Sequence, residues 1–308
     1  MDESLYLDFP TFIRRHLGCR VQKISVDAGF TCPNRDGTVG IGGCSFCNNH
    51  TFNPAYCNSA HPVRQQVEEG VRFFAHKYPE MKYLAYFQAY TNTYGELPHL
   101  ISLYEEALSV PGVVGLVVGT RPDCVDDDLL DYLERLSKRT FVLVEYGIES
   151  VNDATLLRVN RGHTFAQSEE AVRKTAARGI LVGAHMILGL PGEDEAEILR
   201  QPEVLSALPL TILKLHQLQI IRDTRMALEY FSNPSAFHLY SVDEYIDLVV
   251  KYVERLRPDI VLERFVSSSP KELLMASDWK MKNYEYVELL KKRMRHLGTW
   301  QGRLSPFL

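Results

Sequence analysis

Residues 113–148 read VVGLVVGTRPDCVDDDLLDYLERLSKRTFVLVEYGI, and they hold the pattern that decides the fold. An apolar run over 113–119 predicts one strand, and a second run over 140–148 predicts another. Between them, residues 126–137 open with three aspartates, which the helix dipole favours at a helix N-terminus. A strand, a helix and a strand in this order predict two parallel strands with a helix packed across them.

The same alternation runs along most of the chain. The expected strands cover 21–27, 83–89, 113–119, 140–148, 180–190 and 211–219. The expected helices cover 62–76, 98–109, 126–137, 165–178 and 194–208, with a sixth after the capping pattern SVDE at 241–244. The strands are nearly apolar on both faces, which favours a parallel sheet covered by helices, and therefore an α/β fold. Periodicity leaves open whether the sheet closes, curves as a partial barrel or stays flat.

The chain divides near residue 257. Residues 1–257 are expected to form the core, with a lead-in over 1–20, and residues 258–308 a C-terminal α/β extension packed on it. The extension holds one further possible strand in IVLERFV (260–266) and a helix over 284–297. In α/β folds of this kind, ligands bind at the C-terminal ends of the strands.

Composition points to a globular cytoplasmic protein. Of its 308 residues, 45% are hydrophobic and 24% are charged. The acidic start MDESLYLDFPTF resembles no signal peptide, and no long apolar run follows, so neither export nor a membrane span is expected. The six cysteines are therefore expected to be reduced thiols. A net charge of −5 argues against nucleic-acid binding through bulk electrostatics.

Three of the six cysteines lie on one glycine-rich loop, CPNRDGTVGIGGCSFC, which follows the first predicted strand. The pattern of Cys32, Cys44 and Cys47 allows four interpretations of their role. They could be small buried hydrophobes, although their polar surroundings argue against it. They could bind zinc with Cys57 or His50 as fourth ligand, or Cys44 and Cys47 could form a redox pair. The remaining interpretation is an iron–sulfur cluster with one iron left open to a ligand that is not protein.

The loop resembles that of the radical S-adenosylmethionine (SAM) superfamily, in which an aromatic residue, here Phe46, precedes the last cysteine. The eleven residues between Cys32 and Cys44 resemble the spacing of the uncharacterised YhcC/YtqA-type proteins and of the Elongator catalytic subunit. The resemblance covers roughly residues 15–260. It implies a partial (β/α)6 TIM-like barrel, a 4Fe–4S cluster on the three cysteines, and SAM as second cofactor.

The resemblance also implies which strand ends contact SAM. Gln88 and Thr91, after the second strand, stand where the superfamily holds the SAM amino group, although the usual Gly-Gly-Glu run is missing. Glu149, in EYGIES, matches the ribose contact. Arg121 lies at the same rim.

Two more motifs follow. Arg161, in VNRGHT, is implied as a bidentate partner of the SAM carboxylate. Gly189 and Gly192, in MILGLPGED, match the motif on the adenine side.

The implied reaction is reductive cleavage of SAM to a 5′-deoxyadenosyl radical, which abstracts hydrogen from the substrate. It needs an electron donor such as flavodoxin or ferredoxin. Similarity to Elongator suggests the C5 side chain of a transfer-RNA wobble uridine as substrate. The basic run KKRMRH (291–296) could contact phosphates, or it could simply be a solvated helix end.

Two other function classes stay open. One is a radical SAM enzyme acting on a small molecule or peptide, with His163, His185 and His216 as pocket residues. The other is a zinc-binding interaction protein without catalysis, for which Cys57 is the discriminating residue. Cys19, Cys124, the residue that quenches or relays the radical, and the oligomeric state are left unassigned.

Overall fold

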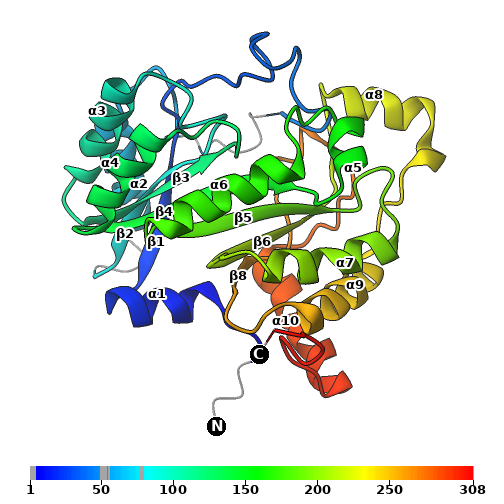
Figure 1. Cartoon of the computed structure of the whole chain (residues 1–308). Coiled ribbons are helices and arrows are strands. Elements are labelled where there is room, and N and C mark those ends of the chain that lie inside the picture. The colour runs from blue at the N-terminus through cyan, green and yellow to red at the C-terminus, as the bar shows by residue number, and fades with distance from the viewer. Residues whose placement is uncertain (1–4, 49–53, 55, 76–79, 308) are drawn as a thin grey trace.

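The computed structural model describes residues 5–48, 54, 56–75 and 80–307. Its centre is a seven-stranded, all-parallel sheet in the order β1-β2-β3-β4-β5-β6-β8, curled into a half-barrel (Figure 1). The strands are β1 (Val21–Val26), β2 (Lys82–Phe87), β3 (Val113–Thr120), β4 (Phe141–Glu149), β5 (Leu181–Leu188), β6 (Ile212–Gln217) and β8 (Val261–Arg264). The predicted partial barrel is confirmed. The strand after residue 257 lies in the main sheet, beside β6, because Val261 pairs with Ile212.

The six predicted helices form and pack on the outer face of the sheet (Figure 1). They are α2 (Val63–Ala75), α3 (Leu97–Leu108), α4 (Asp127–Ser137), α6 (Phe165–Ala177), α7 (Glu195–Ser206) and α9 (Val242–Arg255). Asp126 caps α4 with its carboxylate, and Ser241 and Glu244 form the predicted capping box of α9. No helix in the described ranges is long and apolar enough to cross a bilayer.

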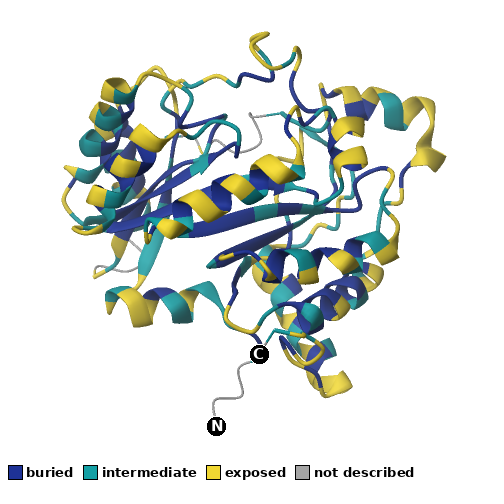
Figure 2. Cartoon of the chain, in the orientation of Figure 1, coloured by how far each residue is buried: buried dark blue, intermediate teal, exposed yellow. Residues whose placement is uncertain are grey.

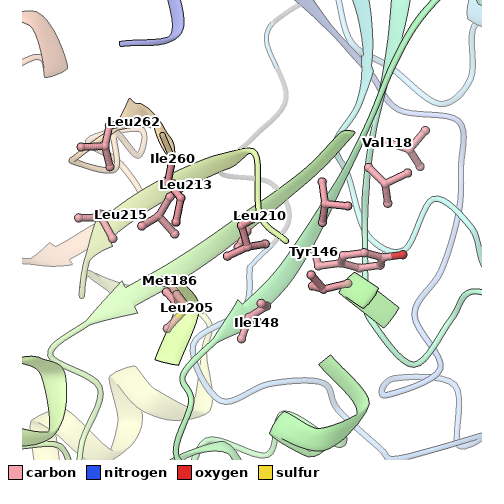
Figure 3. Packing of buried hydrophobic residues seen from close by; sticks show 14 of the residues in the cluster. Val118, Tyr146, Ile148, Met186, Leu205, Leu210, Leu213, Leu215, Ile260 and Leu262 are labelled. Carbon is pink, nitrogen blue, oxygen red and sulfur yellow. The ribbon is translucent and has the colours of Figure 1, made fainter. Parts of the chain in front are cut away.

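The main core lies between this outer face and the helices. The middle strands of the sheet are largely buried and β1 only partly, while the helices expose their outer sides (Figure 2). Figure 3 shows how Leu213 and Leu215 of β6 meet Met186 of β5, Ile148 of β4 and Leu205 of α7. These side chains are fully buried, and those from the strands all lie on the outer face of the sheet.

A helix that the sequence did not predict closes the bottom of the half-barrel. Helix α1 (Phe9–Leu17) is capped by Asp8, and Gly18 ends it in the left-handed conformation. Its Ile13 is buried against Leu84, Phe141 and other inward-facing residues at the N-terminal ends of the strands. The inner face is thus sealed at one end and open at the other.

The remaining elements are small. They are α5 (Asp153–Arg158), α8 (Arg225–Ser232), the 3-10 helix η2 (Pro234–Ala236) and a two-stranded ribbon of β7 (Ile220–Ile221) with β9 (Leu274–Ala276). Helix α10 (Asn283–Leu297) packs against α9. The proposed division of the chain at residue 257 stays a prediction.

Candidate functional site

A cavity of about 600 Å³ fills the inside of the half-barrel and opens at the C-terminal ends of the strands. All three loop cysteines line it. So do most of the other predicted cofactor residues: Phe46, Gln88, Thr91, Glu149 and Arg161, together with Arg121. Residues spread over 130 positions of sequence therefore meet around one space, as expected from the strand-end rule.

Gly189 and Gly192 lie elsewhere. They border a second recess of about 360 Å³, between the turn 189–194 and residues 235–238. Both have positive φ, 92° and 99°, which only glycine adopts without strain. The structure does not bring them to the main cavity, and their contact with adenine stays a prediction.

The cysteine loop is folded by its own backbone. The amide of Arg35 donates to the carbonyl of Cys32 (2.8 Å), and that of Cys47 to the carbonyl of Cys44 (3.1 Å). Gly43, at φ 79°, lies against the Arg35 side chain, which would stand 2.9 Å from a Cβ at that position. The glycines thus let the loop close on itself while its thiols face the cavity.

The thiols are reduced and differ in exposure. None of the six cysteines is in a disulfide, and of the three on the loop Cys44 is buried while Cys32 and Cys47 are partly exposed. Burial, with the nearby Cys44, raises the pKa of Cys47 to about 11, and Arg35 opposes that shift. A metal that binds here must therefore displace a thiol proton, as thiolate ligands require.

The structure does not place the fourth ligand that the zinc alternative requires in the cavity. Cys57 is buried but does not line the cavity, and burial and the adjacent Asp27 raise its thiol pKa to about 12. His50 lies outside the described residues. In the part of the chain that the structure describes, no three His, Cys, Asp or Glu side chains, the three loop cysteines included, are grouped closely enough to hold a metal ion.

Arg161 and Glu149 face the cavity side by side. Glu149 has φ 70° at an irregularity where β4 leaves its register with β5, and its carboxylate lies 3.9 Å from the Arg161 guanidinium. Burial raises the pKa of this carboxyl group, against the opposing effect of Arg161. The Nη2 of Arg161 donates to the carbonyl of Gly147 (2.6 Å), and its Nη1 to Cys44 Sγ (3.4 Å).

Arg121 stabilises the backbone at Arg161. Its guanidinium forms a two-point ion pair with Asp123, at 2.9 and 2.8 Å, and its Nη1 donates to the backbone carbonyl of Arg161 (2.8 Å). Cys124 lies beside this pair, with Sγ 3.8 Å from the Asp123 carboxylate. Arg121 therefore fixes the segment that carries Arg161.

Gln88 and Thr91 also line the cavity. The hydroxyl of Ser25 donates to Gln88 Oε1 (3.3 Å), and the Thr91 amide donates to the carbonyl of Thr31 (3.3 Å), which ties the end of β2 to the start of the cysteine loop. Phe46 packs on a small apolar cluster that includes Leu190 and Leu218.

Comparison with known proteins agrees with this arrangement. Residues 32–200 match the Radical SAM superfamily, and residues 210–296 match the Radical SAM C-terminal domain. The chain belongs to the radical SAM superfamily. It is 34% identical over 301 residues to the uncharacterized protein YtqA of Bacillus subtilis (strain 168), covering 98% of this chain and 93% of YtqA. It is 36% identical over 268 residues to protein YhcC of Escherichia coli (strain K12), covering 87% and 85%.

A solved structure shares the fold. The archaeal Methanocaldococcus infernus Elp3 with an N-terminal deletion superposes with a TM-score of 0.68 at 15% identity, covering 92% of this chain and 64% of that one. The radical SAM chain thus spans less than two thirds of that structure, and the likeness shows the fold alone.

Radical SAM proteins use a 4Fe–4S cluster and SAM, and residues around the cavity fit both. Three reduced thiols on one loop suit a cluster that leaves one iron open. Glu149 makes no hydrogen bond to the described part of the chain, so its carboxylate is available to a ligand with hydroxyl or ammonium donors.

The floor of this radical SAM cavity is charged, which the sequence analysis missed. Lys23 of β1 pairs with Glu145 of β4 (2.8 Å) and Glu263 of β8 (2.7 Å), and Lys214 of β6 pairs with Glu145 (2.6 Å) and Glu263 (3.4 Å). Tyr86 lies in the middle, with both lysine ammonium groups over its ring. The charges of the two lysines and the two glutamates balance one another.

This ring of charges shifts the pKa values of its members. Burial alone would raise the pKa of Glu145, but the two lysines and His185 hold it well below its usual value. Burial lowers the pKa of Lys214 to about 8 despite both glutamates. The signal in the sequence was the alternation in ILKLHQ (212–217), which puts Lys214 and His216 on one face.

Two of the three candidate pocket histidines line the cavity above this floor. His185 Nε2 lies 3.0 Å from Glu145, and His216 Nδ1 lies 2.8 Å from the hydroxyl of Ser267. The Nε2 of His216 is buried with no partner among the described residues. His163 does not line the cavity, and burial and Arg161 lower its pKa to about 3.

The basic run on α10 is far from the cavity. Helix α10 lies at the bottom of Figure 1, while the blue cysteine loop is at the top. Arg293 pairs with Asp243 (3.1 Å) and Asp247 of α9, whereas Lys292 and Arg295 are exposed. No α10 residue lines the cavity.

Proposed function

We propose that this protein is a radical SAM enzyme that binds a 4Fe–4S cluster through Cys32, Cys44 and Cys47 and abstracts hydrogen from a substrate held in the half-barrel. The observation that carries the proposal is that the three cysteines, Glu149 and Arg161 all line a single cavity. When bound, the cluster and SAM supply one-electron cleavage of SAM to the 5′-deoxyadenosyl radical.

We assign different roles in that chemistry to the residues that line the cavity. The thiolates bind iron, Glu149 accepts hydrogen bonds from the SAM ribose, and Gln88 and Thr91 orient its amino group. Arg161 is placed where it can act on the SAM carboxylate or on the cluster. Helix α1 and the charged floor close the cavity from below, which supports exclusion of water and protection of a radical.

The substrate is proposed to lie between the thiols and the floor. His185 and His216 line that layer, and the unpaired Nε2 of His216 offers a hydrogen bond to a polar substrate group. This observation favours a small molecule, a peptide side chain or an extruded nucleoside that fits inside the cavity.

A transfer-RNA wobble uridine remains our proposal for the macromolecular case, on the resemblance to the Elongator subunit. Because α10 is remote from the cavity, an RNA whose uridine enters the half-barrel is expected to be held mainly by other cations, such as Arg35 and Arg264 at the cavity lining. Reversing the charges at Lys292 and Arg295 tests this: unchanged transfer-RNA binding removes α10 from the RNA site.

We also propose that the protein works in the cytoplasm with an electron donor of the flavodoxin or ferredoxin kind. The partner supplies the electron that SAM cleavage consumes.

The proposal is tested by measuring 5′-deoxyadenosine after anaerobic reconstitution with iron and sulfide and reduction with dithionite in the presence of SAM. Wild type is expected to form it, and Cys32→Ala, Cys44→Ala and Cys47→Ala are expected to fall to background. Cys57→Ala and Cys19→Ala are matched controls that keep activity. Loss of bound metal in Cys57→Ala, with zinc in the wild type, would overturn the proposal in favour of the zinc alternative.

A further inference from the structure

Two of the three cluster cysteines receive side-chain hydrogen bonds: Cys47 from Arg35, and Cys44 from two other residues. Cys44 is the buried one, and two side-chain nitrogens point at its sulfur. Arg161 Nη1 lies 3.4 Å and Asn34 Nδ2 lies 3.7 Å from Cys44 Sγ. Both distances suit N–H···S hydrogen bonds, which are longer than N–H···O bonds because sulfur is large.

Arg161 is held so that it cannot easily turn away from Cys44. The side chain is 8% exposed, and its Nη2 donates to the carbonyl of Gly147 (2.6 Å). Its backbone carbonyl accepts from Arg121, which is itself clamped by Asp123. The two terminal nitrogens are therefore engaged with the chain, and only Nε is buried without a partner.

Asn34 is held even more tightly. It is 1% exposed, and its Nδ2 also donates to the carbonyls of Asn160 (2.6 Å) and Arg161 (3.3 Å). Two glycines pack against its amide: a Cβ at Gly162 would stand 2.8 Å from Oδ1, and one at Gly40 would clash with it. The Oδ1 atom has no hydrogen-bond partner in the described part of the chain, so the amide is oriented by what its nitrogen contacts.

We propose that Arg161 and Asn34 are positioning residues for the cluster, which donate N–H···S hydrogen bonds to the Cys44 thiolate and raise the reduction potential of the cluster. The inference rests on the proposed function. Reduction adds negative charge to the cluster and its sulfurs, so a donor, and above all a fixed cation, stabilises the reduced state more than the oxidised one. Such contacts around a ligand tune a metal centre without binding it.

This role differs from the one that the resemblance implies for Arg161, which is a bidentate contact to the SAM carboxylate. Nη1 and Nη2 already donate to Cys44 and Gly147, so a bidentate contact with SAM would have to share the guanidinium with these two partners. The two roles predict different behaviour in the absence of SAM, because only the cluster role acts on a protein that holds no SAM.

The test is a redox titration of the reconstituted protein, followed by electron paramagnetic resonance in the absence of SAM. Arg161→Gln is expected to lower the midpoint potential most, Arg161→Lys less because a cation remains, and Asn34→Leu by a smaller amount because the donor is neutral and more distant. Arg158→Gln is the matched control: Arg158 is exposed and pairs with Glu229, so its loss leaves the potential unchanged.

A second measurement compares wild type with Arg161→Lys, both grown with 15N-arginine. Electron–nuclear double resonance is expected to show a 15N coupling and an exchangeable proton coupling in wild type that are lost in Arg161→Lys, in which Arg35 still contacts Cys47. Absence of both couplings, or equal potentials in wild type, Arg161→Gln and Asn34→Leu, overturns the inference. Equal potentials together with weaker SAM binding in Arg161→Gln would return Arg161 to the SAM carboxylate. If wild type assembles no iron cluster, the proposed function fails instead.

Discussion

The two faces of the same sheet differ in the chemistry of their buried side chains. On the outer face, Leu213, Met186 and Ile148 are fully buried against helices, where apolar contact supplies stability. On the inner face, one residue away in β6, Lys214 is buried among two glutamates, another lysine and a tyrosine. A ring of buried ions stabilises a fold less well than apolar packing does, so its presence marks the inner face as the functional one.

Two glutamates illustrate the difference. Glu145, on the inner face, contacts Lys23, Lys214 and His185, and these cations hold its pKa well below the usual value. Glu193, in the turn after β5, is bonded to neutral donors, the hydroxyls of Ser150 and Thr155 and the Gln201 amide (3.2 Å). Burial therefore raises the pKa of Glu193 to about 7.

The largest effect is expected for Glu145→Ala. The change leaves Lys23 and Lys214 buried with one carboxylate between them, which should cost about 3–5 kcal/mol in the free energy of unfolding. Urea denaturation of the metal-free protein measures it. Glu134→Ala, which removes an exposed carboxylate paired with Lys138, is the control and should cost less than about 1 kcal/mol. Equal costs for the two variants would refute the distinction between the faces.

A somewhat smaller effect is expected for Leu213→Ala on the outer face. Leu213 is fully buried, so its truncation should cost about 3 kcal/mol through lost contact and a residual cavity. The paramagnetic spectrum of the reconstituted cluster should stay as in wild type, because the side chain faces away from the cavity. Leu228→Ala, at an exposed leucine, serves as control. A lost or altered cluster signal in Leu213→Ala would mean that the faces are not separable.

The smallest effect concerns pH and Glu193. Its folded pKa of about 7 lies above the ordinary value of 4.5, so the folded state keeps its proton where the unfolded state has lost it. Stability is therefore fully present below about pH 4.5 and falls as pH rises toward 7, by about 1–3 kcal/mol. Thermal unfolding of wild type and Glu193→Gln across this window should converge at low pH and separate toward neutral pH. Parallel curves would contradict the assignment.

Most strands and helices could be predicted from the sequence, because the periodicity of apolar residues in each segment agrees with the capping and turn residues at its ends. Helix α1 was not predicted because the charged run 14–16 follows its short apolar start. Its apolar residues become buried only against the bottom of the half-barrel, which a local sequence pattern does not reveal. The charged floor was missed because the strands were described as nearly apolar on both faces. The alternation of Lys214 and His216 with leucines shows that one face is polar.

The site was readable to a similar depth. The cysteines and the strand-end residues share one cavity because parallel strands deliver their C-termini to one edge. The contacts of Arg161 and Asn34 with Cys44 could not be predicted, because they depend on how residues 34, 44 and 161 approach across two loops. Gly189 and Gly192 lie at the expected strand end but border a second recess, so their contact with adenine stays a prediction.

The central claim is that the three loop cysteines hold a cluster with an iron open to SAM. It is tested most directly by anaerobic reconstitution, metal counting, and electron paramagnetic resonance of the reduced protein with and without SAM. Iron and sulfide in 4Fe–4S stoichiometry, with a spectrum that SAM alters, is the predicted result. Zinc in place of iron, or an iron spectrum that SAM leaves unchanged, would contradict it.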